Sequence, residues 1–173
     1  MHERPAIVGV GNVLMGDDGA GPAAVEALRR AGLADRADLF DAGLAFSEVL
    51  CELQPHRPLV IIDAVRGGGE PGSIYRLGLA DLDAGRAGMA GAYSLHELSV
   101  LPALRMEALA GRVFEDVTIF GIEPAQVAWG EGLSRPVARA VEMLPAEICH
   151  YLDDCAARGH TGAARAARGS EKP

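Results

Sequence analysis

The sequence has few of the residues that mark membrane proteins or nucleic-acid-binding proteins. Aromatic residues make up 5% of its 173 residues. No apolar run is long enough to span a bilayer. Basic residues are outnumbered, with 16 Lys and Arg against 24 Asp and Glu, so the formal net charge is -8. Because a surface of that sign repels nucleic acids and anionic membranes, we expect neither among the partners.

Cysteine is also scarce, and the 3 cysteines, Cys51, Cys149 and Cys155, form no CxxC pair. An odd number without metal-ligand spacing predicts reduced thiols, not a disulfide framework or a structural zinc site. The N-terminal pentapeptide does not look like a signal peptide, because a strand pattern starts at Ala6. Both features predict a cytoplasmic protein.

Short apolar strands alternate with helical patterns along the chain. The expected strands are Ala6–Val10, Ala37–Phe40, Leu59–Ile62, Ser73–Leu77 and Asp116–Ile122. The expected helices are Ala20–Ala31, Ala45–Leu53, a segment from Ser94 to about Leu109, and a last one from Ser134 to about Ala156. This alternation predicts an α/β fold, a three-layer α/β/α sandwich whose sheet is mostly parallel with helices on both faces. Ser73–Leu77 is a candidate for an antiparallel edge strand.

Two regions lack such periodicity. Asp81–Ala92 has mixed polarity and three glycines, which predicts a mobile surface segment. Residues 157–173 carry Ala, Gly, Arg and Ser without spaced hydrophobic residues, which predicts a disordered tail. We therefore expect one domain over residues 1–156.

The stretch from Ala6 to Gly21, AIVGVGNVLMGDDGAG, places two adjacent carboxylates, Asp17 and Asp18, in an exposed glycine-framed loop just past the first strand. A lone Asp-Gly pair usually only makes a turn. Here, however, Asp41 and Asp63 follow the next two expected strands. Because the carboxyl ends of parallel strands share one edge of the sheet, the topology predicts a shared acidic crevice there.

His96 is the fourth candidate residue. Ser94 to Glu97 matches the capping-box pattern, which places His96 in the first turn of a helix. The helix dipole disfavours imidazolium there and so favours the neutral imidazole that binds metals. Two carboxylates and one imidazole would form an oxygen and nitrogen site for a borderline divalent ion, unlike a closed structural zinc site.

Taken together, the motifs resemble those of the hydrogenase maturation proteases, the endopeptidases that trim the C-terminus of the nickel-iron hydrogenase large subunit. The resemblance extends over roughly residues 7–152 and rests on GVGNVLMGDDGAGP, DAG at Asp41, IIDAV around Asp63, YSLHELS around His96 and GIEP at residues 121–124.

This resemblance implies that Asp18, Asp63 and His96 are both the metal ligands and the catalytic residues. Asp17 is the alternative to Asp18, because the family often has Glu as the second acid of the pair. The implied metal is nickel brought by the large-subunit precursor, which is also the implied partner, and no organic cofactor is expected. One peptide bond near the precursor's C-terminus would be cut, with water activated by either the metal or a carboxylate.

Other functions remain open at this point. A non-hydrolytic nickel-sensing chaperone or a small-molecule-binding module on the same Rossmann-like sheet would use the same crevice. A dinucleotide-binding oxidoreductase is disfavoured, because Leu14 stands where the third glycine of its fingerprint should be. Trp129 is expected to pack against the protein more readily than to contact a partner.

Overall fold

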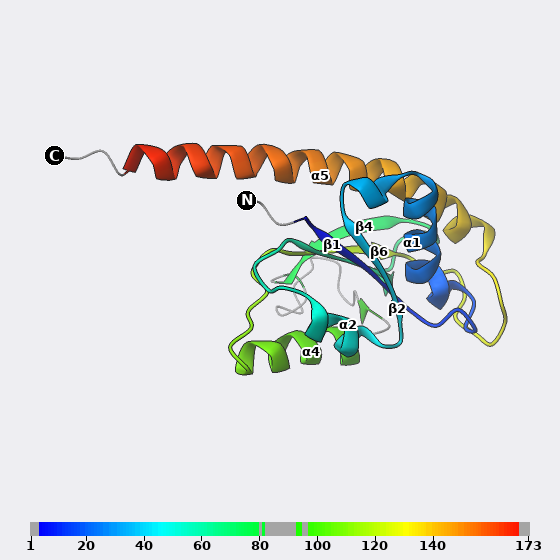
Figure 1. Cartoon of the computed structure of the whole chain (residues 1–173). Coiled ribbons are helices and arrows are strands. Elements are labelled where there is room, and N and C mark those ends of the chain that lie inside the picture. Colours follow the sequence, from blue (N-terminus) through cyan, green and yellow to red (C-terminus); the bar gives the residue numbers. More distant parts are fainter. Residues whose placement is uncertain (1–3, 80, 82–92, 95–96, 170–173) are drawn as a thin grey trace.

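The computed structural model describes residues 4–79, 81, 93–94 and 97–169. A central sheet lies between two layers of helices (Figure 1). The strands are β1 (Ala6–Val10), β2 (Asp38–Gly43), β3 (Leu59–Arg66), β4 (Ile74–Gly78), β5 (Tyr93–Ser94) and β6 (Val117–Ile122). The helices are α1 (Ala20–Arg30), α2 (Phe46–Glu52), α4 (Glu97–Leu109), α5 (Arg135–Gly169) and the short 3-10 helices η1 (Asp17–Gly19) and η2 (Leu33–Asp35). No helix in this part of the chain combines the length and hydrophobicity that a bilayer crossing needs.

The sheet has the strand order β2-β1-β3-β6-β4. The first four of these strands are parallel, and β4 pairs antiparallel with β6 at the edge. This arrangement confirms the predicted mostly parallel sheet and its antiparallel edge strand. The sequence did not predict β5, which pairs antiparallel with the last residues of β3.

Both faces of the sheet are covered by apolar side chains. Ile7 faces the cluster formed with α1 and α5, whereas its neighbour Val8 faces the cluster formed with α2 and α4. Strands buried on both faces need apolar residues at successive positions, which explains the unbroken apolar runs in β1 and β3. The ends of these central strands are therefore rigid supports for the loops that follow them.

Two strands are longer than the sequence predicted. β2 continues to Gly43 and β3 continues to Arg66, so Asp41 and Asp63 lie within strands and do not follow them. β3 gains length because it lies between β1 and β6 and its last two residues also pair with β5.

The last helix also differs from the sequence prediction. α5 continues to Gly169, where the sequence predicted a disordered tail from residue 157. Alanine and arginine favour helix, and elongating a packed helix avoids the cost of nucleating a new one. The C-terminal half of α5 projects beyond the sheet (Figure 1). The predicted surface segment Asp81–Ala92 lies almost entirely outside the described residues.

A chain ending at Ala157 should keep its fold and its melting temperature within a few degrees. The reason is that, among the side chains of α5 that the structure describes (residues 135–157), Leu152 is the last in the buried core. Thermal unfolding followed by circular dichroism measures the effect. A chain ending at Glu147 is the control, because it also loses Ile148 and Tyr151 from the core and should be clearly destabilised. An insoluble or much less stable protein ending at Ala157 would show that the projecting helix packs.

Candidate functional site

Two glycines let the loop after β1 fold tightly over the ends of the central strands. A Cβ on Gly21, the second residue of α1, would lie 2.5 Å from the carbonyl oxygen of Ile62 in β3. Gly11 has a φ of 141°, and a Cβ there would lie 1.9 Å from the carbonyl oxygen of Asp18. A side chain at either position would push the loop away. The segment that carries Asp18 is therefore held against the ends of β1 and β3.

Asp18 and Asp63 are both buried at this edge of the sheet. Oδ2 of Asp18 accepts a hydrogen bond from the backbone N–H of Asn12 at 2.9 Å. Asp63 follows Ile62, and its Oδ1 accepts one from the N–H of Ala64 at 2.8 Å. The predicted exposed loop around Asp18 is wrong, because the loop closes over its own carboxylate. Buried carboxylates are costly to retain unless they are hydrogen-bonded or bind a cation.

Asp17, the alternative to Asp18, binds to another part of the chain. Its Oδ2 accepts hydrogen bonds from the N–H groups of Ala125 at 2.8 Å and Gln126 at 3.0 Å. The N–H of Ser134 donates to Oδ1 at 2.6 Å, and the Ser134 hydroxyl donates to Oδ2 at 2.9 Å. These four bonds tie the segment between β6 and α5 to η1. Asp17 therefore has a structural role, which leaves Asp18 as the candidate site residue.

Glu123 is a second buried carboxylate that supports a loop, a role that no local sequence pattern indicates. Its Oε2 accepts hydrogen bonds from the N–H of Gly67 at 2.6 Å and from the hydroxyl of Tyr75 at 2.7 Å. Burial, followed by this hydrogen bond to Glu123, raises the pKa of Tyr75, so its hydroxyl keeps its proton at neutral pH. Glu123 thereby fixes the turn between β3 and β4 beside the ends of the parallel strands.

The remaining two predicted residues differ in how much the structure says of them. Asp41 is exposed, and its Oδ1 accepts a hydrogen bond from the N–H of Gly43 at 3.2 Å, so it shapes the end of β2. His96 and part of the predicted capping box lie outside the described residues. Within the described part of the chain, no three His, Cys, Asp or Glu residues form a group that could hold a metal ion. The three-residue metal site stays a prediction.

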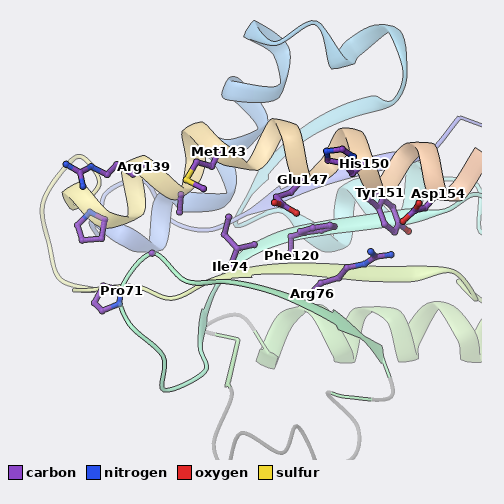
Figure 2. Close-up of a pocket in the computed structure, with 13 residues that line it drawn as sticks. Pro71, Ile74, Arg76, Phe120, Arg139, Met143, Glu147, His150, Tyr151 and Asp154 are labelled. Carbon is purple, nitrogen blue, oxygen red and sulfur yellow. The ribbon is translucent and has the colours of Figure 1, made fainter.

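A cavity of about 590 Å³ lies between α5 and β4, and none of the predicted site residues lines it (Figure 2). The guanidinium of Arg76 lies over the Tyr151 ring, 4.6 Å from its centroid. Burial raises the pKa of Tyr151 to about 12, so its hydroxyl stays protonated and donates to Oγ1 of Thr118 at 3.1 Å. Asp18 and Asp63 do not line this cavity, so we do not assign the proposed chemistry to it.

The chain is similar to proteins of one family over most of its length. The family model described as hydrogenase maturation protease matches residues 22–151. The hydrogenase expression/formation protein HupD of Rhizobium leguminosarum bv. viciae is 30% identical over 136 residues, which cover 78% of this chain and 66% of the relative. HupD of Bradyrhizobium diazoefficiens is 31% identical over 136 residues, covering 78% of this chain and 70% of the relative.

A solved structure agrees with these sequence matches. The NiFe hydrogenase maturation protease HybD from Thermococcus kodakarensis superposes with a TM-score of 0.70 at 26% identity, covering 87% of this chain and 99% of that one. The similarity to this protease extends over most of the chain, so it includes the glycine-framed loop and the two buried acids beside it. The chain belongs to the hydrogenase maturation protease family, and it is a peptidase of that family.

Proposed function

We propose that this protein removes the C-terminal extension of a nickel-iron hydrogenase large-subunit precursor after nickel has been inserted. Asp18, Asp63 and His96 would coordinate the nickel that the precursor carries. Family membership supports a hydrogenase subunit as the partner. We place the reaction in the cytoplasm, where unpaired cysteines such as Cys51 and Cys149 stay reduced.

The pairing of β5 with β3 is the observation that carries this proposal. Ser94 pairs with Val65, which lies two residues beyond Asp63 in β3. His96 follows Ser94 by two residues in the sequence. The chain therefore reaches the Asp63 end of β3 just before the predicted imidazole ligand. This placement supports a site that combines Asp63 with His96.

The predicted donors suit the proposed cargo. Two carboxylates and an imidazole match a borderline divalent ion such as nickel, and three ligands leave coordination positions for groups of the precursor. Such an ion could polarise the scissile carbonyl, and a neighbouring carboxylate could accept a proton from the attacking water. Either route uses the same residues, so the substitutions below test the site without choosing between them.

The free protein should bind nickel weakly, with a dissociation constant above about 1 µM. Its predicted ligands come from separate segments, and the precursor is proposed to complete the coordination shell. Isothermal titration calorimetry with nickel measures the affinity, with Asp63→Asn as the control for nickel bound elsewhere. A stoichiometric ion that survives dialysis against a chelator would instead indicate a metalloprotease with its own resident metal.

Co-expression with candidate large subunits tests the proposed activity and identifies the client. The client subunit should migrate as a shorter polypeptide when this protein and a nickel supply are both present. Omission of nickel is the matched control and should leave the precursor at full length. A precursor that associates with the protein but is never shortened would favour the nickel-sensing chaperone instead.

A further inference from the structure

Three large apolar side chains are exposed on the loops beside the candidate site. Val13 and Leu14 follow β1 and are 55% and 45% exposed, and Trp129, between β6 and α5, is 81% exposed. We call these three residues the apolar rim. The sequence-based expectation that Trp129 packs against the protein is wrong. Clustered exposed apolar residues usually mark an interaction site, and tryptophan is enriched among the residues that dominate binding energy.

Backbone hydrogen bonds hold the two loops of the apolar rim together. The N–H of Gly16 donates to the carbonyl of Gly130 at 2.8 Å, and the N–H of Gly130 donates to the carbonyl of Leu14 at 3.0 Å. Gly16 also forms an isolated β-bridge with Val127. Figure 1 shows the blue loop after β1 and the yellow loop after β6 side by side. The rim is therefore preformed, which lowers the entropy cost of binding a partner.

A shallow hollow of about 280 Å³ adjoins the rim. Its lining includes Trp129, Leu133, Gly16 and Gly130, together with the acidic residues Asp17 and Glu131. An apolar residue beside a hollow suits an anchor side chain from a partner, because both the residue and the anchor lose contact with water.

We infer that the apolar rim is a docking surface for the large-subunit precursor. This inference rests on the proposed function. The rim is continuous with the proposed substrate site. Val13 and Leu14 directly follow Asn12, whose N–H donates a hydrogen bond to the Asp18 carboxylate. Precursor bound on this rim would be held directly beside the predicted metal ligand. The partner surface must offer apolar side chains to the three rim residues, beside the acidic Glu131 that also lines the hollow.

Replacing Trp129 should weaken docking without changing the chemistry. Trp129→Ala should raise the KM for nickel-loaded precursor about tenfold or more and leave kcat near the value of the unaltered protein. Leu109→Ala is the matched control, because Leu109 is 83% exposed at the far end of α4 and should not affect KM. An unchanged KM for Trp129→Ala would overturn the docking surface.

The protein has a single tryptophan, so docking can also be observed directly. Fluorotryptophan incorporated into the full-length protein gives one fluorine NMR resonance, which reports on Trp129. Addition of unlabelled nickel-loaded precursor should shift or broaden that resonance, even with Asp63→Asn present to prevent cleavage. An unmoved resonance at saturating precursor would contradict the inference. If the unaltered protein fails to cleave the precursor, the proposed function is contradicted. The fluorine resonance of Trp129 then still tests docking independently.

Discussion

Asp63→Asn, Asp18→Asn and His96→Ala should each lower kcat/KM for the nickel-loaded precursor by at least about a thousandfold. Each substitution removes one of the three side-chain groups predicted to coordinate the nickel. An amide keeps the shape of a carboxylate, but it loses the negative charge that binds a divalent ion or accepts a proton. Quantification of the shortened large subunit over time measures the loss.

These variants should stay folded, which separates loss of function from loss of structure. Asparagine at position 63 can still accept from the N–H of Ala64, and asparagine at position 18 can still accept from the N–H of Asn12. Both changes also replace a buried charge with a neutral group, which reduces the desolvation cost. Circular dichroism should therefore show the fold of the unaltered protein for both asparagine variants. The same is expected for His96→Ala, because the sequence predicts this residue at a helix end and not in the core.

The combined variants test whether the residues act as one unit. The double variant Asp18→Asn with Asp63→Asn should lose little more activity than either single variant, because the first change already removes most of the function. Near-normal cleavage of the precursor by His96→Ala would contradict the proposed nickel site.

Asp17→Asn should be the most destabilising of the acid-to-amide changes, by about 3 kcal/mol. Its carboxylate accepts four hydrogen bonds, including three from the N–H groups of Ala125, Gln126 and Ser134. An amide places an NH₂ group against some of these donors and leaves them without an acceptor. For a chain of this size that cost lowers the melting temperature by about 6 to 12 °C.

Two further variants make the Asp17 result interpretable. Asp35→Asn changes an exposed acid of η2 and should shift the melting temperature by about a degree or less, because such surface changes cost little. Ser134→Ala removes only the hydroxyl donor to Asp17 and should cost about 1 kcal/mol. A melting temperature for Asp17→Asn equal to that of the unaltered protein would contradict the structural role. For precursor cleavage the sequence predicts a milder effect of Asp17→Asn than of Asp18→Asn if Asp18 is the ligand, and an equal or larger effect if Asp17 is.

The contrast between neighbouring Asp17 and Asp18 shows where sequence reasoning stops. The strand, the glycine-framed loop and helix α1 follow from local apolar runs and turn residues, and the structure confirms them. The partners of Asp17, however, lie more than a hundred residues further along the chain, and Ser134 is 117 residues away. No local pattern carries that information, so the choice between the two acids needed the fold.

Other differences have similar physical causes. β5 has only two residues, and it exists because the end of β3 offers a pairing edge, not because its sequence alternates. The exposure of Trp129 depends on how two loops meet, and a single tryptophan in a loop gives no sign of that. By contrast, the buried strands β1, β3 and β6 were predictable because their apolar runs reflect burial on both faces of the sheet.

The intact mass of the nickel-loaded large-subunit precursor after incubation with this protein tests the central claim most directly. We predict a loss of mass equal to one C-terminal peptide, and no loss from nickel-free precursor or with Asp63→Asn. The proposal would be contradicted if the mass of the client's nickel-loaded precursor stayed unchanged. It would also be contradicted if the precursor were cleaved equally with and without nickel.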